Sequence, residues 1–317
     1  MKTYLVTGGA GFIGSNLIEQ LLKSSKVIVL DNFNSHYDPM IKENNIKTFL
    51  NHKNFKLYRG DIRDRVILNE IFRDNQIDCV IHLAALAGVR NSINNPMLYQ
   101  DVNCNGTLNI LEIMHLHDVK KIVFASSSSV YGNLKEVPFR EDMSTDFCIS
   151  PYAATKKSSE IMIYTYSKLY NINSVILRLF TAYGPRQRPD LAISKFTSFI
   201  LEDKPIYMYG NGDTYRDYTY IDDIVSGIIK SIEYVSNNND IYEIFNIGSS
   251  NPIKLKYMID VISDELKKEA KIVQMGMQQG DVDRTYADIT KAKNILNYEP
   301  QTSFEDGIKK FIKYYKR

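Results

Sequence analysis

The chain alternates short runs of β-branched and other apolar residues with longer segments whose apolar positions recur at helical spacing. This alternation is typical of a parallel sheet with helices on both faces. The apolar runs predict strands at Tyr4–Thr7, Val27–Asp31, Lys56–Arg59, Cys79–Leu83, Lys121–Ser126 and Val175–Leu179. The amphipathic segments between them predict helices at Ile13–Lys23, Val66–Arg73, Leu98–His115 and Pro151–Tyr170. Each connection is long enough for a crossover helix, so we expect an α/β fold with a doubly wound parallel sheet.

After about residue 180 the pattern changes to shorter elements interrupted by glycine and proline. The run Ser236–Asp240 predicts a solvated loop, and the apolar segment Ile244–Ile247 predicts one more strand. We therefore expect an N-terminal doubly wound domain over residues 1–180 and a smaller C-terminal part over residues 181–317. A segment near residues 217–247 is expected to return to the first domain.

The charge balance argues against partners that are recruited by electrostatic attraction. The 317 residues include 39 basic and 37 acidic side chains, interspersed along the chain, for a formal charge of +2. Neither nucleic acid nor a membrane surface is an expected partner. No apolar run approaches the roughly 20 residues of a membrane span, and we expect no signal peptide before the first strand.

The cysteines and histidines form no cluster along the chain. Cys79, Cys104 and Cys148 are too widely spaced for a metal motif or a disulfide framework, and the five histidines are dispersed. We therefore expect no metal site. A reducing, cytoplasmic compartment is the default expectation for such cysteine usage.

The first strand runs directly into a glycine-rich turn and a helix. Gly8, Gly11 and Gly14 suit a tight turn, the close approach of backbone to a pyrophosphate, and close packing of helix on strand. Asp31 ends the next strand, where a carboxylate accepts hydrogen bonds from the adenosine ribose and repels a 2′-phosphate. No arginine follows at 32–36 to bind such a phosphate. A glycine triplet alone also marks ordinary turns, but this context predicts a dinucleotide site that prefers NAD to NADP.

A second group of residues suits proton transfer. Ser150 and Pro151 are typical of a helix start, and Tyr152 and Lys156 are four residues apart on one face of that helix. An ammonium near the phenol lowers its pKa, which favours a role as a base. The hydroxyl-rich segment Phe124–Gly132 follows a predicted strand at the sheet edge where ligands bind. Tyr and Lys at this spacing are also a common surface pair, so it is the combination that indicates an active site.

Taken together, these features resemble the extended short-chain dehydrogenases/reductases, and among them the nucleotide-sugar 4-epimerases. The motifs that carry the resemblance are Gly8–Gly14, Asp31, Asp61, His82–Ala85, Ser127, and Tyr152 with Lys156. A narrower similarity to UDP-glucuronate 4-epimerases is carried by Ala87–Arg90, Phe180–Asp190, Gln279–Val282 and Thr285–Asp288. The resemblance covers nearly the whole chain. It implies a Rossmann-type NAD-binding domain and a smaller part that binds a UDP-sugar.

The resemblance also implies a role for each matching residue. Tyr152 removes the proton from the sugar O4, Ser127 hydrogen-bonds O4, and Lys156 binds the nicotinamide ribose. The implied cofactor contacts are Gly8, Gly11, Phe12, Ile13, Gly14, Asp31, Asn32, Asp61, Ile62, Leu83, Ala84, Ala85, Asn103, Tyr152 and Lys156. The implied contacts to the UDP-sugar are Arg90, Ser128, Thr181, Arg188, Lys195, Arg216, Asp281 and Arg284.

Residues beside these motifs indicate which type of reaction and which sugar to expect. Related dehydratases and decarboxylases carry an acidic residue after the catalytic hydroxyl, whereas this chain has Ser128 and Ser129, so elimination is disfavoured. Oxidation of a glucuronate at C4 makes a β-keto acid that tends to lose CO2, and we expect Thr181 and the Arg188 region to restrain its carboxylate. Gln278 replaces a phosphate-binding arginine of glucose/galactose epimerases. Thr285 stands at a pocket position where it leaves N-acetyl sugars possible.

The expected activity is an NAD-dependent 4-epimerase that interconverts UDP-glucuronate and UDP-galacturonate through a 4-keto intermediate, in polysaccharide biosynthesis. Alternatives are a UDP-glucose or UDP-N-acetylglucosamine 4-epimerase, a 4-keto-sugar reductase that needs external NAD(P)H, and a non-catalytic NAD-binding sensor. The segments Leu98–His115 and Pro151–Tyr170 are apolar on more than one face. The resemblance implies that they form a homodimer interface, and deeper burial against the chain's own sheet is the alternative.

Overall fold

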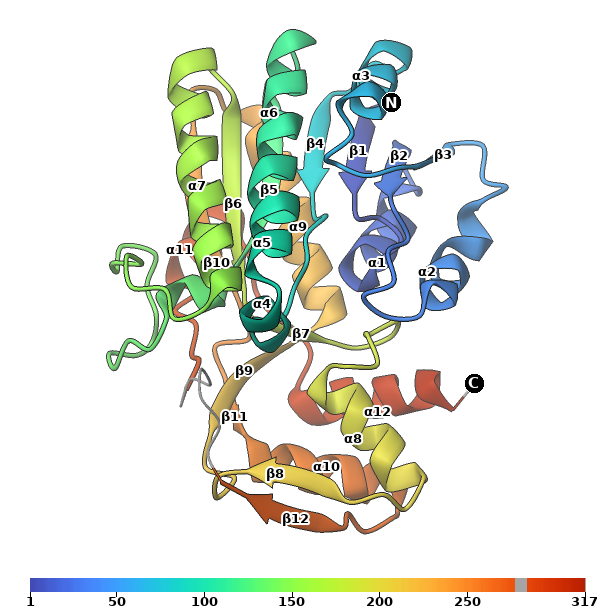
Figure 1. The fold of residues 1–317 in the computed structure, drawn as a ribbon, viewed down its shortest axis with the longest axis vertical. Helices are drawn as coiled ribbons and strands as arrows, with labels where there is room; N and C mark the ends of the chain where they lie inside the picture. Colours follow the sequence, from blue (N-terminus) through green and yellow to red (C-terminus); the bar gives the residue numbers. More distant parts are fainter. Residues whose placement is uncertain (277–283, 317) are drawn as a thin grey trace.

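A seven-stranded parallel sheet organises the larger part of the molecule (Figure 1). The computed structural model describes residues 1–276 and 284–316. The strands are β1 (Thr3–Thr7), β2 (Lys26–Asp31), β3 (Phe55–Arg59), β4 (Cys79–His82), β5 (Lys121–Ser127), β6 (Asn173–Leu179) and β10 (Tyr242–Ile247). They pair in the order β10-β6-β5-β4-β1-β2-β3, and every pair is parallel. The order reverses between β1 and β4, and a crevice for ligands is expected at the carboxyl ends of these two strands.

Helices cover both faces of this sheet because alternate residues of each strand point to opposite sides. Val6 joins one apolar cluster and its neighbour Leu5 joins the other. Figure 1 shows α6 and α7 in front of the sheet and α9 behind it. The helices around the sheet are α1 (Phe12–Leu21), α2 (Pro39–Ile46), α3 (Arg65–Asp74), α4 (Val89–Asn94), α5 (Pro96–Tyr99), α6 (Gly106–Leu116), α7 (Pro151–Tyr170), α9 (Ile221–Asn237) and α11 (Thr290–Leu296). Short 3-10 turns are η1 (Lys47–Phe49) and η3 (Ser128–Tyr131).

The remaining elements lie beyond the carboxyl ends of β1, β4 and β5 (Figure 1). Strands β7 (Thr181–Tyr183), β9 (Tyr215–Tyr220) and β11 (Pro252–Lys254) form a small sheet in the order β11-β9-β7. Strands β8 (Ile206–Tyr209) and β12 (Ile272–Met275) form a parallel pair. The helices of this part are α8 (Ala192–Leu201), α10 (Leu255–Leu266) and α12 (Phe304–Tyr315). They pack on the small sheets and face the crevice of the large one.

The predicted fold class is confirmed, and the predicted strands are all present within a residue or two of their expected ends. Strand β10 lies beside β6, at the edge of the large sheet. The division into domains at residue 180 stays a prediction. The expected loop Ser236–Asp240 is wrong at its first two residues, because α9 continues to Asn237. Val235 is fully buried in the last turn of α9, and this burial outweighs the weak helix propensity of the residues after it.

The expected helix Leu98–His115 is present but irregular. It runs from α5 through a π-helical segment, η2 (Gln100–Asn105), into α6. π-Helical turns are rare and are frequent at functional sites. In the part of the chain that the structure describes, no helix has the length and apolar character that crossing a lipid bilayer requires.

Candidate active site

The glycine-rich turn between β1 and α1 lies at the point where the strand order reverses. Gly8 has φ +72°, and a Cβ there would lie 2.8 Å from the backbone nitrogen of Ala84. A Cβ on Gly14 would lie 2.4 Å from the carbonyl oxygen of Gly8. Only glycine fits at either position, so the turn stays close against the segment that follows β4. The N-terminus of α1, with its free N–H groups, is left beside the crevice, as binding a phosphate requires.

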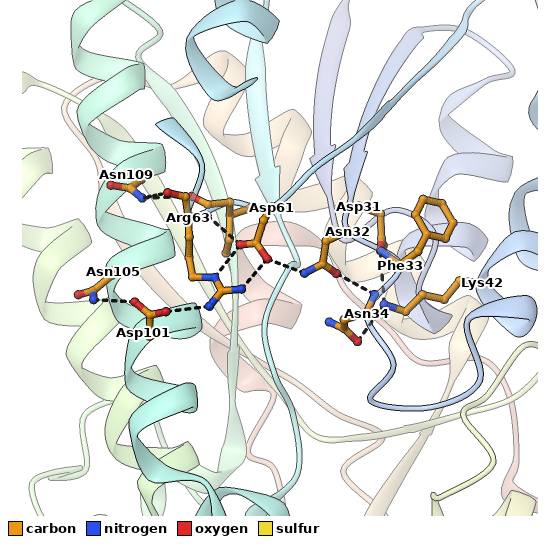
Figure 2. A network of polar contacts seen from close by, with 11 residues as sticks. Asp31, Asn32, Phe33, Asn34, Lys42, Asp61, Arg63, Asp101, Asn105 and Asn109 are labelled. Carbon is orange, nitrogen blue, oxygen red and sulfur yellow. Dashed lines mark hydrogen bonds and ion pairs between the residues drawn. The ribbon is translucent and has the colours of Figure 1, made fainter. Parts of the chain in front are cut away.

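Asp31, at the end of β2, is buried in a polar cluster beside this turn. Its Oδ2 accepts a hydrogen bond from the Ala10 N–H at 3.1 Å, and its Oδ1 accepts one from the Phe33 N–H at 2.9 Å. The Nζ of Lys42 lies 3.4 Å from Oδ1, and both side chains of this ion pair are more than nine-tenths buried. Figure 2 shows Lys42 reaching back from α2 toward Asp31 and Asn34. The sequence analysis missed this cation.

Asp61 belongs to a neighbouring part of the same network. Its carboxylate accepts hydrogen bonds from Asn32 at 2.7 Å and from the guanidinium of Arg63 at 2.9 Å, and Arg63 also contacts Asp101 (Figure 2). Burial raises the pKa of Asp61, but the hydrogen bonds from Arg63 and Asn32 outweigh that effect and hold it at about 2. Both oxygens of the Asp61 carboxylate are thus hydrogen-bonded to side chains of the protein itself.

A cavity of about 400 Å³ extends from the glycine turn toward α7. Its wall includes most of the expected cofactor contacts: Gly8, Gly11, Phe12, Ile13, Gly14, Asp31, Asn32, Ile62, Leu83, Ala84, Ala85, Tyr152 and Lys156. It also includes four residues after β2 that no sequence motif indicated, namely Asn34, His36, Tyr37 and Lys42. The Nε2 of His36 is buried without a hydrogen-bond partner among the described residues. Asp61 and Asn103 do not line the cavity.

Asn103 instead connects three elements behind the cavity wall. Its Oδ1 accepts from the Leu86 N–H at 2.8 Å, and its Nδ2 donates to the Leu86 carbonyl and to Thr155 Oγ1, each at 3.0 Å. Thr155 lies on α7 between Tyr152 and Lys156, and its hydroxyl donates to the Tyr152 carbonyl at 2.8 Å. The π-helical segment therefore fixes the cavity wall after β4 against the turn of α7 that carries Tyr152 and Lys156.

The three expected catalytic residues all line this cavity. Ser127 ends β5, while Tyr152 and Lys156 lie on the first turns of α7. That helix begins as expected: Ser150 Oγ accepts from the Ala153 N–H at 3.1 Å, and Pro151 takes the first helical position. The structure thus brings together residues that lie in two separate elements.

The electrostatics of Tyr152 differ from the expectation. Burial raises its pKa above the ordinary value of 10, although the nearby Ser127 hydroxyl and the charge of Arg188 act in the other direction. The ammonium of Lys156 donates to the Ala125 carbonyl at 2.7 Å and lies 4.8 Å from the centre of the Phe124 ring. Burial lowers the pKa of Lys156 to about 8. The expected depression of the Tyr152 pKa by Lys156 is therefore wrong, because burial dominates and the Lys156 ammonium lies against the Ala125 carbonyl and the Phe124 ring.

A second cavity, of about 440 Å³, adjoins the first. Gly88, Val89, Arg188 and Leu191 line both. The wall of the second cavity carries four of the expected substrate contacts: Arg90, Arg188, Lys195 and Arg216. Asp190 is the one acidic residue in that wall among the residues that the structure describes. Ser128 and Thr181 line the first cavity. Arg188 thus lies in the same cavity wall as Tyr152 and Ser127, while Arg90, Lys195 and Arg216 line the adjoining cavity.

The remaining expected contacts lie elsewhere. Arg284 is exposed outside both cavity walls, with its guanidinium carbon 4.7 Å from the centre of the Tyr215 ring. Thr285 does not line a cavity, because its hydroxyl accepts from the Asp217 N–H at 3.0 Å and is buried. Asp281, Gln278 and the motif Gln279–Val282 lie outside the described residues. No group of three or more potential metal ligands occurs within residues 1–276 and 284–316.

Comparison with known proteins assigns the family. The family profile described as GDP-mannose 4,6 dehydratase matches residues 5–311. The chain belongs to this family of extended short-chain dehydrogenases/reductases. A UDP-glucuronate 4-epimerase of Thermodesulfobacterium geofontis is 45% identical over all of this chain and 97% of its own length.

Two solved structures of the same family share the complete architecture. UDP-glucuronic acid 4-epimerase from Bacillus cereus, in complex with UDP-glucuronic acid and NAD, superposes with a TM-score of 0.93 and 37% identity over 99% of both chains. UDP-glucose 4-epimerase from Thermotoga maritima, with UDP-glucose, superposes with a TM-score of 0.90 and 31% identity over 99% of this chain and 98% of its own. Family membership thus extends over both cavities, and the family includes epimerases of acidic and of neutral sugars.

Proposed function

We propose that this protein is an NAD-dependent 4-epimerase that interconverts UDP-glucuronate and UDP-galacturonate. The observation that carries the proposal is the junction of the two cavities, where Ser127, Tyr152 and Lys156 meet a wall of basic side chains. The relatives described above act on or bind UDP-sugars, and the Bacillus cereus structure contains both UDP-glucuronic acid and NAD.

The first cavity fits a dinucleotide. The glycine turn leaves room for a pyrophosphate where a Cβ would clash, and Asp31 is placed to accept from a ribose. The buried, unpartnered Nε2 of His36 in the same wall offers a further polar contact. Bound NAD supplies a nicotinamide ring that can take a hydride from the sugar C4 and return it.

The side chains of this protein handle the proton and the orientation of the sugar. Tyr152 takes the proton from O4 during oxidation and returns it during reduction, while Ser127 hydrogen-bonds O4. Because burial raises the Tyr152 pKa, the phenolate needs help from the Ser127 hydroxyl and the positive charge of Arg188. Lys156 holds the nicotinamide ribose and adds positive charge at the base of the site. These roles are part of the proposal.

The type of reaction is indicated by the lack of a carboxylate near Ser127 in the wall of the first cavity, among the described residues. Within the described residues, Asp31 is the only carboxylate in the wall of the first cavity, and it is paired with Lys42 at the far end. Elimination of water from a 4-keto sugar needs a base for the C5 proton. Ser128 and Ser129 stand where such a carboxylate would follow Ser127, so oxidation, rotation and reduction at C4 is favoured over dehydration.

An acidic sugar suits the charge of the second cavity. Four basic side chains face one carboxylate in that wall. A UDP-glucuronate carries a diphosphate and a carboxylate, one negative charge more than UDP-glucose. Thr181, in the wall of the first cavity, and Arg188, at the junction, would restrain the sugar carboxylate and so keep the 4-keto acid from losing CO2. UDP-glucose 4-epimerase, with the same catalytic groups, is the second candidate, since the Thermotoga maritima relative shares the fold.

The test is to incubate the purified protein separately with UDP-glucuronate, UDP-glucose and UDP-N-acetylglucosamine, without added cofactor, and to follow products by NMR. We expect UDP-galacturonate from the first and little product from the others. Tyr152→Phe should abolish turnover, whereas Tyr164→Phe, on an exposed position of the same helix, should not. Epimerisation of UDP-glucose alone would establish the second candidate, and no epimer from any sugar would refute the proposal.

The proposal includes a homodimer in the cytoplasm. Adjacent helices α5 and α7 expose apolar side chains, including Met97, Leu98 and Ile161. A second copy would cover them by the same helix packing. All three cysteines are free, which suits a reducing compartment. Sedimentation should give a dimer that Ile161→Glu converts to monomer; a monomeric wild type at micromolar concentration would refute the dimer.

A further inference from the structure

Arg188 and Asp190 form a two-point ion pair at the junction of the cavities. The Nε of Arg188 donates to Oδ1 of Asp190 at 2.9 Å, and Nη2 donates to Oδ2 at 2.6 Å. The Arg188 side chain is only 15% exposed, and that of Asp190 is 42% exposed. Pro189 stands between them and fixes its own φ, which limits the ways in which the two side chains can meet. Paired fork-to-fork bonds of this kind fix the orientation of a guanidinium.

The ion pair occupies one edge of the guanidinium and leaves another available. Within the described residues, Nη1 of Arg188 has no hydrogen-bond partner. The ring of Tyr37 lies 6.0 Å from the guanidinium carbon, on the side of the first cavity. Arg188 lines both cavities, whereas Asp190 lines only the second. Arg188 therefore lies at the junction, close enough to Tyr152 for its charge to act on the phenol, with one edge of its guanidinium not held by Asp190.

We propose that Asp190 is a positioning residue that sets how the enzyme handles an acidic sugar: by holding Nε and Nη2 of Arg188, it presents Nη1 to the sugar carboxylate in one fixed orientation. This inference rests on the proposed function. Asp190 has a second effect on the same site, because its negative charge offsets that of Arg188. The charge of Asp190 thus weakens the attraction of the site for an acidic sugar, while its hydrogen bonds to Arg188 improve the alignment of that sugar.

Alignment matters because the oxidised sugar can take a side path. In the 4-keto acid, the bond between C5 and C6 can break, so that CO2 leaves and its electron pair forms an enolate across C4 and C5 that then takes a proton. The oxidation at C4 that precedes this cleavage would need NAD, held by the first cavity, as the hydride acceptor. This cleavage requires the breaking bond to line up with the carbonyl π system. A carboxylate held by a fixed guanidinium is kept out of that alignment, and a mobile one is not.

Two variants separate the charge of Asp190 from its volume. Asp190→Asn keeps the shape and removes the charge, and Asp190→Ala frees Arg188 completely. Binding is measured by calorimetry in a Tyr152→Phe background, in which no turnover occurs. There we expect Asp190→Asn to lower the dissociation constant of UDP-glucuronate about fivefold and to leave that of UDP-glucose unchanged. With Tyr152 present, kcat for UDP-glucuronate should fall about tenfold, and the fraction of decarboxylated UDP-4-keto-pentose should rise about tenfold in both variants.

The matched control is Asp203→Asn, which removes an exposed carboxylate paired with Lys268 far from the junction. It should leave binding and products unchanged. If the Asp190 variants change binding of both sugars equally, or leave the product ratio as in wild type, Asp190 has only a folding role and the inference is wrong. Absence of UDP-glucuronate turnover in the wild type would instead refute the proposed function, and the binding comparison would still decide the role of Asp190.

Discussion

At the scale of single residues, the buried pair of Asp31 and Lys42 decides which dinucleotide the first cavity favours. Asp31 keeps both oxygens on backbone N–H groups, so its negative charge is held in place, and Lys42 neutralises it at 3.4 Å. The sequence argument for NAD depended on a lone carboxylate. Because the charge of Lys42 is already balanced by Asp31, we expect it not to bind a 2′-phosphate.

Asp31→Asn should therefore shift the cofactor preference toward NADP. The change leaves Lys42 buried without its carboxylate, and a 2′-phosphate would then supply the missing negative charge. Titration of cofactor-free protein should show NAD affinity falling about tenfold and NADP affinity rising. Glu43→Gln, which removes an exposed carboxylate paired with Arg59, is the control and should change neither. An unchanged ratio of the two affinities would contradict this account.

At the same scale, the buried ring of His82 makes the stability of the protein depend on pH. Its ring is fully buried between Thr7, at 2.7 Å from Nδ1, and Thr107, at 3.0 Å from Nε2. Burial lowers the pKa of His82 to about 3, and the charge of Lys156 adds to that effect. The unfolded chain therefore binds a proton on this residue between about pH 6.5 and pH 3 and the folded protein does not.

Stability must consequently fall as the pH falls through this window. The contribution of His82 to the free energy of unfolding is complete above pH 6.5 and decreases by about 1.4 kcal/mol per pH unit below it. Urea unfolding of His82→Gln and wild type at pH 7, 6 and 5 should show a difference that shrinks toward low pH. The exposed His52→Gln variant should follow wild type throughout. A difference that is constant with pH would refute the assignment.

Local motifs could be found from the sequence and partners distant along the chain could not. Gly8, Gly14, Tyr152 and Lys156 sit at fixed spacings that their chemistry requires. His36 lies in an irregular segment and Lys42 on the short helix α2, and no periodicity predicts that either side chain reaches the cavity. Lys156 shows a further limit: its partner, the Ala125 carbonyl, is a backbone group that the sequence cannot identify.

At the scale of elements, strands were easier to predict than the helices that cross the site. The apolar runs predicted the parallel sheet, while the three-residue strands β7 and β11 are too short to show a pattern. The segment η2 was expected as ordinary helix, because no residue type in Gln100–Asn105 marks a π-helical turn. Its effect is nevertheless large, since it turns Asn103 toward both Leu86 and Thr155.

Asn103→Ala tests the importance of that turn. The change leaves the backbone of Leu86 and the hydroxyl of Thr155 without their buried partner, which should lower the free energy of unfolding by about 3 kcal/mol. It should also loosen the cavity wall and lower the amount of NAD that copurifies. Asn105→Ala lies in the same π segment but removes only an exposed bond to Asp101. Equal losses of stability in the two variants would show that the buried hydrogen bonds of Asn103 stabilise the fold no more than the exposed bond of Asn105.

At the scale of the whole molecule, the two parts of the chain are interleaved. Strand β10 is made from residues 242–247 but lies beside β6, and α9 from residues 221–237 covers the same sheet. All seven residues of β6 are buried. The sequence indicated a returning segment, but not which edge of the sheet it joins, because strand order is set by packing over the whole fold.

A fragment of residues 1–180 should therefore fail to fold alone. It would expose the edge of β6 and the sheet face that α9 covers, and exposed apolar edges aggregate. We expect this fragment to be insoluble or to lack cooperative unfolding by circular dichroism. A fragment of residues 1–251 retains α9 and β10 and should recover more soluble protein. Soluble, cooperative behaviour of the shorter fragment would contradict this prediction.

The place of β10 also has a consequence for how the protein is made. A ribosome releases β6 well before it releases β10, because residues 180–247 must first be translated. At roughly 10 residues per second, that interval lasts roughly seven seconds. During this time the nascent chain presents a hydrophobic strand edge that no part of itself can yet cover. The apolar edge of β6 is therefore exposed to aggregation during synthesis and is covered in the finished fold.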